Sequence, residues 1–144
     1  MSQFFIQDKE QMRLLARQLA EQALCNNIYA LTGTLGSGKT FFAKEFINSL
    51  QKEKDTILSP TFNIVNYYES QKGLIYHFDL YRIEDENELE NIDFFDSINS
   101  GICLIEWPEI ALKFLPSNYI EINISHNIED KLQTRTVKIT HNAK

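Results

Sequence analysis

The sequence contains the segment Gly33-Thr34-Leu35-Gly36-Ser37-Gly38-Lys39-Thr40, which matches the pattern Gly-x4-Gly-Lys-[Ser/Thr] of phosphate-binding loops. Its three glycines permit positive φ angles and a close approach of the backbone to a ligand. The N–H groups of such a loop point inward and bind an anion, and the positive end of a following helix reinforces them. We therefore expect Lys39 to contact the β- and γ-phosphates of a nucleotide, and the Thr40 hydroxyl to bind Mg²⁺, which prefers oxygen ligands.

The residues on both sides of the loop favour the strand–loop–helix context that this motif requires. Residues 28–32 are a short apolar run with β-strand character, and residues 41–50 carry apolar side chains at 42, 43, 46, 47 and 50, which is helical spacing. A chance glycine-rich turn would lack these flanks. The residues expected to contact the nucleotide are Gly33, Leu35, Gly36, Ser37, Gly38, Lys39, Thr40 and Phe41.

The size and composition of the chain favour one soluble domain over residues 1–144. Apolar residues make up 43% and charged residues 24% of the sequence, as in ordinary globular proteins. The net charge is −6, and there is no dense run of Lys and Arg, so we do not expect an extensive nucleic-acid-binding surface. No apolar run approaches the roughly 18 residues of a membrane span. The two cysteines, Cys25 and Cys103, have no metal or disulfide spacing, which indicates a reduced, cytoplasmic protein in which both are small buried side chains.

The remaining pattern predicts an α/β fold in which strands, hairpins and helices surround the phosphate-binding loop. An edge strand is expected at Gln3–Ile6, followed by an amphipathic helix that Asp8 caps. Hairpins are expected from strands at 62–68 and 74–78, and at 119–125 and 134–140, a buried strand at 102–105, and helices at 84–99 and 109–114.

Two acidic residues stand where a nucleotidase needs carboxylates. Asp79 follows the expected strand at 74–78, and Glu106 follows the apolar run at 102–105, which is typical of a strand buried on both faces. Ligands of α/β folds bind at the carboxyl ends of the strands, and nucleotide hydrolysis needs carboxylates for Mg²⁺ and for water. Either acid can fill either role, and the alternative is a strand-end residue without a chemical role.

Three further residues have a structural and a functional interpretation. Pro60 constrains the backbone at Thr61, whose hydroxyl can contact Mg²⁺ or the γ-phosphate as switch threonines do, although spacing alone leaves this open. For His77 we expect a half-buried structural histidine rather than a catalytic one. For Trp107 we expect a packing residue at the rim of the site rather than a platform for a base.

Four segments in this order resemble the TsaE family, the small ATPases of the bacterial tRNA threonylcarbamoyladenosine pathway. They cover the chain from about Leu31 to Trp107, and the second and third are unusual among P-loop proteins. The segments are Gly33-Thr34-Leu35-Gly36-Ser37-Gly38-Lys39-Thr40, Ser59-Pro60-Thr61-Phe62, His77-Phe78-Asp79-Leu80-Tyr81-Arg82 and Leu104-Ile105-Glu106-Trp107.

The resemblance implies a single P-loop NTPase domain of the α/β class, with a mixed, mostly parallel sheet flanked by helices and hairpins. It also implies an ATPase that uses ATP and Mg²⁺ and acts beside the proteins TsaB and TsaD, resetting their complex between rounds of tRNA modification. It implies metal ligands among Thr40, Asp79 and Glu106, and catalytic roles for Glu106, Asp79 and Thr61. The sequence departs from the family where a second Thr and a nearby Arg often follow the loop, because Phe41 and Lys44 stand there.

Two other classes of function remain open. A small-molecule kinase usually closes an arginine-bearing lid over the phosphates, and this chain has only four scattered arginines, at positions 13, 17, 82 and 135. A nucleotide-gated assembly subunit with little turnover would share every site residue with an ATPase. The same scarcity of arginine predicts an enzyme that is weak without partners, since an arginine finger supplied in trans contributes about 10³–10⁵ in rate.

Overall fold

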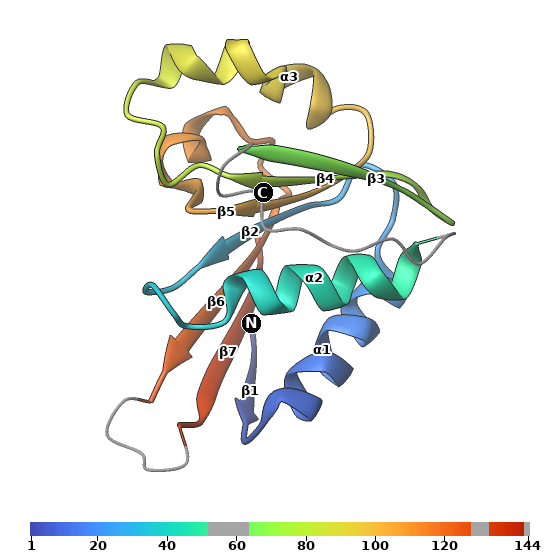
Figure 1. The fold of residues 1–144 in the computed structure, drawn as a ribbon, viewed down its shortest axis with the longest axis vertical. Helices are drawn as coiled ribbons and strands as arrows, with labels where there is room; N and C mark the ends of the chain where they lie inside the picture. The colour runs from blue at the N-terminus through green and yellow to red at the C-terminus, as the bar shows by residue number, and fades with distance from the viewer. Residues whose placement is uncertain (52–63, 128–132, 143–144) are drawn as a thin grey trace.

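The computed structural model describes residues 1–51, 64–127 and 133–142, and its centre is a seven-stranded sheet in the order β1-β7-β6-β2-β5-β4-β3 (Figure 1). The expected mixed sheet, flanking helices and hairpins are confirmed. The strands are β1 Ser2–Ile6, β2 Ile28–Thr32, β3 Val65–Ser70, β4 Gly73–Asp79, β5 Ile102–Glu106, β6 Ile120–His126 and β7 Arg135–His141.

The parallel part of the sheet is its middle, and antiparallel hairpins extend both edges. The pairs β6–β2, β2–β5 and β5–β4 are parallel, whereas β1–β7, β7–β6 and β4–β3 are antiparallel. The described sheet is therefore evenly mixed rather than mostly parallel, because each hairpin adds an antiparallel pair. The carboxyl ends of β2, β4 and β5 meet at one edge, where the Cα of Glu106 is in register with Leu31 on one side and Asp79 on the other.

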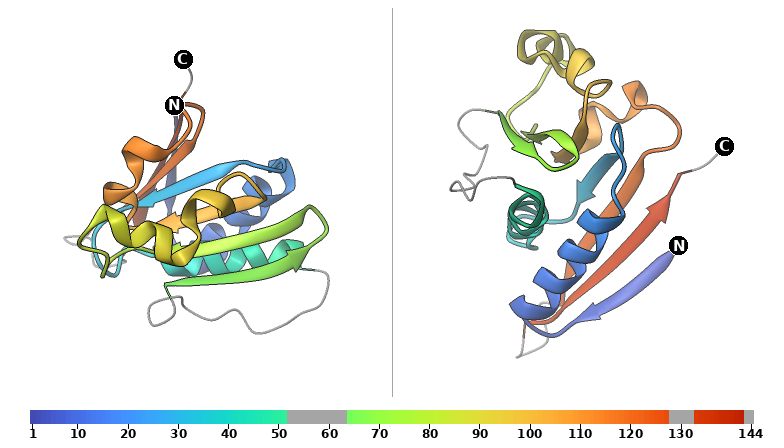
Figure 2. Two further views of the ribbon diagram at one scale, coloured as in Figure 1. Left: turned by 90° about the horizontal axis from the view of Figure 1, so that it is seen from above. Right: turned by 90° about the vertical axis from the view of Figure 1, so that its right-hand side faces the viewer.

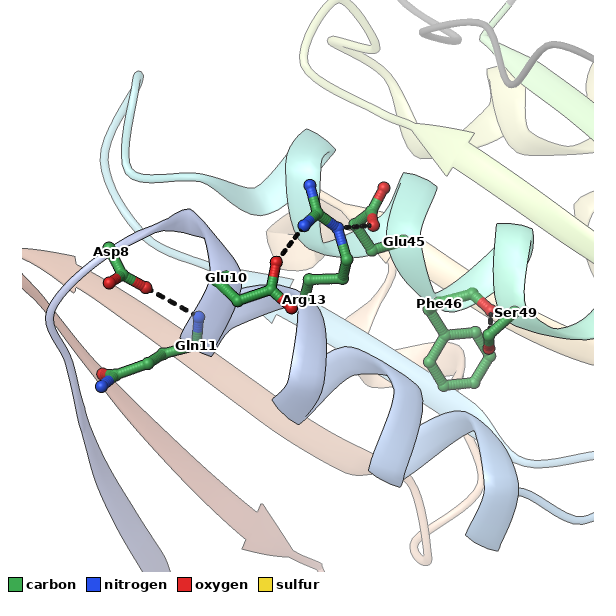
Figure 3. A network of polar contacts seen from close by, with 7 residues as sticks. All are labelled: Asp8, Glu10, Gln11, Arg13, Glu45, Phe46 and Ser49. Carbon is green, nitrogen blue, oxygen red and sulfur yellow. Dashed lines mark hydrogen bonds and ion pairs between the residues drawn. The ribbon is translucent and has the colours of Figure 1, made fainter.

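Two helices, α1 (Lys9–Gln22) and α2 (Lys39–Leu50), cover one face of the sheet (Figure 2). Asp8 caps α1 as expected, with its carboxylate accepting from the Gln11 N–H at 2.9 Å. Arg13 joins the two helices, since its Nε donates to Glu45 Oε1 at 2.6 Å, and it also pairs with Glu10 (Figure 3). The core between these helices and the sheet includes Met12, Leu15, Ala16, Phe42, Phe46, Ile47, Leu31, Leu104 and Ile122.

Lys72, in the turn between β3 and β4, closes the other end of α1. Its Nζ donates to the carbonyl oxygens of Ala20, Glu21 and Ala23 at 2.9, 2.5 and 2.7 Å. The last carbonyls of a helix lack partners inside the helix, so this ammonium satisfies them and joins the hairpin to α1. Cys25 lies just beyond, in the turn before β2, and it is exposed rather than buried as predicted, while Cys103 is buried.

The opposite face of the sheet is covered by short helical turns rather than by the single helix predicted at 84–99. That segment forms a 3-10 helix at Glu86–Ile92 and one turn of α3 at Phe94–Ser97, separated by Asp93 with φ 54°. The apolar residues at 89, 92, 95 and 98 recur every three positions, which is the period of a 3-10 helix. The segment predicted as a helix at 109–114 likewise forms two 3-10 turns, Pro108–Ile110 and Leu112–Phe114. In the described ranges no helix combines the length and apolar character that crossing a bilayer requires.

Candidate functional site

The loop between β2 and α2 has the backbone that its glycines predict. Gly33 and Gly38 have φ angles of 141° and 115°, in the region that favours glycine. A Cβ added at Gly33 would lie 2.3 Å from the carbonyl oxygen of Ile124 on β6, so a larger residue cannot occupy this position. Gly38 precedes the first residue of α2, and the N–H groups of that helix end face the loop.

Lys39 is almost completely buried, and its ammonium is bound by the loop itself. Its Nζ donates to the carbonyl oxygens of Gly33 at 2.7 Å and Thr34 at 2.9 Å, and it lies 4.1 Å from the centroid of the Trp107 ring. Burial lowers the pKa of Lys39, and the nearby charges of Glu106, Glu109 and Asp79 act in the opposite direction. A ligand phosphate that contacts this lysine must therefore replace contacts that it already makes.

The carboxylate of Glu106 connects the loop to strand β4. Its Oε1 accepts from the Thr40 hydroxyl at 2.6 Å, and its Oε2 lies 2.6 Å from Nε2 of His77. Glu106 is 2% exposed and His77 is 0% exposed, so the histidine is fully rather than half buried. It is buried because it lies on the face of β4 that α2 covers, opposite Leu104 of β5. A charged carboxylate at this depth needs such donors, since an unpaired buried charge is very costly.

The second acid, Asp79, ends β4 beside Glu106. Its Oδ1 accepts from the N–H of Tyr81 at 3.0 Å, and it is buried. Asp79, Glu106, Lys39 and Thr40 line one cavity of about 380 Å³, which confirms that the ends of β2, β4 and β5 bring these residues together. Its other lining residues are Leu35, Gly36, Gly38, Phe41, Tyr81, Arg82 and Trp107. Thr61, predicted as a switch threonine, lies outside the described residues.

A second cavity, of about 310 Å³, lies on the other side of the loop. Gly38 and Phe41 line both cavities, so the start of α2 separates them. The other lining residues of the second cavity are Ile6, Gln7, Asp8, Lys9, Met12, Ser37, Gln133 and Arg135. Sequence reasoning missed Arg135, whose Nε donates to the carbonyl oxygen of Ser37 at 2.8 Å. No motif surrounds this arginine, and only the pairing of β7 with β6 and of β6 with β2 brings it to the loop.

The oxygen atoms around the first cavity fit Mg²⁺. The Thr40 hydroxyl and the carboxylates of Asp79 and Glu106 are hard ligands of the kind that this ion prefers. Within the described residues there is no group of three or more His, Cys, Asp or Glu side chains that could hold a metal ion by themselves.

Comparison with known proteins places the chain in a family. The family model described as "Threonylcarbamoyl adenosine biosynthesis protein TsaE" matches residues 6–137. A protein of Rickettsia felis named "tRNA threonylcarbamoyladenosine biosynthesis protein TsaE" is 38% identical over 126 residues, which cover 88% of this chain and 74% of the relative. A protein of Bacillus subtilis with the same name is 34% identical over 122 residues, which cover 85% and 76%.

The fold also matches a solved structure. A crystal structure of Bacillus subtilis YdiB superposes with a TM-score of 0.75 at 26% sequence identity, covering 99% of this chain and 86% of that one.

Proposed function

Because the chain belongs to the TsaE family of threonylcarbamoyl adenosine biosynthesis proteins, we propose that it binds ATP and Mg²⁺ at residues 33–40 and hydrolyses the ATP. The observation that carries this proposal is the 2.6 Å hydrogen bond from Thr40 to Glu106. It joins the last residue of a phosphate-binding loop to a carboxylate at the end of the neighbouring parallel strand. In P-loop nucleotidases a loop Ser or Thr and a strand-end carboxylate hold the Mg²⁺ together, so the two groups have to lie close to each other.

The two cavities suggest how ATP lies along the loop. We place the β- and γ-phosphates in the cavity with Lys39 and Thr40, and the adenine base in the cavity beyond Phe41. The latter combines apolar side chains, Ile6, Met12 and Phe41, with the polar Gln7 and Asp8, which is the usual character of a site for a flat heterocycle. Since Gly38 and Phe41 line both cavities, a bound nucleotide extends from one cavity into the other across the start of α2.

Each residue of the first cavity then has a role that its contacts support. Lys39 exchanges the carbonyls of Gly33 and Thr34 for phosphate oxygens. The Thr40 hydroxyl donates a hydrogen bond to Glu106, which leaves the lone pairs of its oxygen available to a cation. Glu106 and Asp79 hold the metal and its water and orient the attacking water. Mg²⁺, when bound, supplies positive charge to the phosphate oxygens.

The contacts of two arginines support a protein that is a slow ATPase by itself. Arg13 pairs with Glu10 and Glu45, and Arg135 binds the loop carbonyl of Ser37, so neither is placed to contact a γ-phosphate. Arg82 lines the phosphate cavity, and it is exposed. We propose that TsaB and TsaD complete the site, and that hydrolysis resets their complex between rounds of tRNA N6-threonylcarbamoyladenosine formation.

A second candidate is a nucleotide-gated assembly subunit, in which ATP binding rather than hydrolysis does the work. The contacts of Lys39 favour it, because nucleotide binding must displace this lysine from Trp107 at the rim of the cavity. By contrast, the positions of Arg13 and Arg135 give no support to the arginine-bearing lid of a small-molecule kinase.

Modification of tRNA by a TsaB–TsaD pair, measured over many rounds, separates these candidates. We expect the pair to continue beyond the first round only when this chain and ATP are added, and Glu106→Gln to remove that effect. Sustained rounds with Glu106→Gln would identify the gating subunit, and an unchanged number of rounds with the wild-type chain would contradict both candidates.

A further inference from the structure

His77 has one hydrogen-bond partner and a second nitrogen that lacks one. It stands on β4 between Ile75 and Asp79 on the same face of the strand, and no part of it is exposed. Its Nε2 lies 2.6 Å from Oε2 of Glu106, while its Nδ1 has no hydrogen-bond partner among the described residues. Buried polar atoms are nearly always paired, so an unpaired one calls for an explanation.

These contacts determine which nitrogen carries the proton. An ionised carboxylate only accepts hydrogen bonds, so the contact with Glu106 requires a hydrogen on Nε2 of His77. The other neutral tautomer would direct a nitrogen lone pair at the carboxylate and would bury an N–H without an acceptor. The structure therefore assigns the Nε2–H tautomer to His77, with Nδ1 as the unpaired acceptor.

An apolar residue would fill this position without an unpaired nitrogen, as Ile75 does two residues earlier on the same face. What the imidazole adds is its contact with Glu106. The terminal torsion of a glutamate is broad, but here one donor meets each oxygen, Thr40 at Oε1 and His77 at Oε2. Together the two donors fix the plane of the carboxylate.

We propose that His77 is a positioning residue, whose Nε2–H holds the Glu106 carboxylate in the orientation that keeps Oε1 on the Thr40 hydroxyl. The proposal rests on the proposed function, in which Thr40 and Glu106 bind Mg²⁺ and water. Residues that orient metal ligands in this way typically contribute about 10–100-fold to metal affinity or activity. His77 itself does not line the cavity in which we place the phosphates and the metal.

Two substitutions at the same position separate this role from packing. His77→Leu keeps an apolar volume and removes the donor, whereas His77→Gln can place an amide N–H near the position of Nε2. His141→Gln, at the exposed end of β7, is the matched control. Calorimetry with a non-hydrolysable ATP analogue, with and without Mg²⁺, measures how much the metal increases the affinity, and steady-state kinetics measures kcat and KM separately.

We expect His77→Leu to bind the metal-free analogue as the wild type does, to lose about 10–100-fold of the Mg²⁺-dependent gain, and to lose kcat by a similar factor. His77→Gln should recover most of both losses, and His141→Gln should change neither. In a Glu106→Gln background, His77→Leu should have almost no further effect, since it acts through that carboxylate. Equal losses in the Leu and Gln variants would show that the losses come from disturbed packing rather than from the missing donor, and this result or wild-type behaviour of His77→Leu would overturn the proposal.

A measurement on the wild-type protein tests the proposal even if the His77 variants do not fold. Nitrogen-15 NMR of the histidine rings should show that Nε2 of His77 is protonated and Nδ1 is not. The His77 signals can be assigned by their disappearance in any folded His77 variant or by through-bond correlation. The reverse tautomer would overturn the proposal. A wild-type protein that binds the analogue without any Mg²⁺-dependent gain would instead contradict the proposed function.

Discussion

Replacing Lys39 by methionine should weaken ATP binding by about 10–100-fold while leaving the fold intact. A charge-assisted hydrogen bond to phosphate contributes about 1.5–3 kcal/mol, and each 1.4 kcal/mol is a factor of ten in affinity. The wild-type lysine must first leave Gly33 O, Thr34 O and the Trp107 ring, so the net loss should lie in the lower part of that range. The same substitution removes a buried cation along with its two hydrogen bonds. These opposing effects should keep the free energy of unfolding within about 1 kcal/mol of the wild type.

Titration calorimetry with ATP and Mg²⁺ measures the affinity, and chemical denaturation measures the stability of the same samples. Lys44→Met is the matched control, because it makes the same change on α2 at a residue that does not line either cavity. A folded Lys39→Met protein with wild-type affinity, or an equal loss in Lys44→Met, would refute the assignment of the loop as the phosphate site.

Four further predictions concern the contacts around the site and the helix end. Asp79→Ala and Glu106→Ala should each abolish ATP turnover and leave most of the nucleotide binding, because the loop backbone is separate from these carboxylates; wild-type turnover in both variants would leave them as strand-end residues. Lys72→Met should lower the free energy of unfolding by about 1–2 kcal/mol, since three carbonyls at the end of α1 lose their donor; an unchanged denaturation midpoint would count against this. Because burial lowers the pKa of Lys39 below 10.5, ATP affinity should fall as the pH rises through that lowered pKa, and Lys39→Met should not show this fall. Between the lowered pKa of Lys39 and pH 10.5, the lysine is protonated in the unfolded chain but not in the folded chain. The free energy of unfolding should therefore rise with pH in this range.

The local parts of the site could be predicted from the sequence because their signals are local. The loop from Gly33 to Thr40 carries its own pattern, and the helix after it follows from apolar spacing. Asp79 and Glu106 could be selected in advance because each follows an apolar strand, and ligands of α/β folds bind at the carboxyl ends of strands. The structure adds that they are in register on neighbouring parallel strands and line a common cavity.

The contacts that depend on strand order and register could not be predicted in this way. Arg135 reaches Ser37 only because β7 and β6 pair on the β2 side of the sheet, and nothing near residue 135 indicates that order. The contact of His77 with Glu106 crosses from β4 to β5 and depends on side-chain direction. The helix predicted at 84–99 was wrong because apolar residues spaced by three fit a 3-10 helix as well as an α-helix.

We propose that this chain is an ATPase that TsaB and TsaD activate, and the rate of ATP hydrolysis tests both parts of this proposal. The rate should be measured for the chain alone, with the TsaB–TsaD pair, and with tRNA alone, and Glu106→Gln should accompany each arm as a control. We expect slow hydrolysis by the chain alone, no stimulation by tRNA alone, and a large stimulation by the pair that Glu106→Gln abolishes. Fast hydrolysis by the isolated chain, or strong stimulation by tRNA without TsaB and TsaD, would contradict the account.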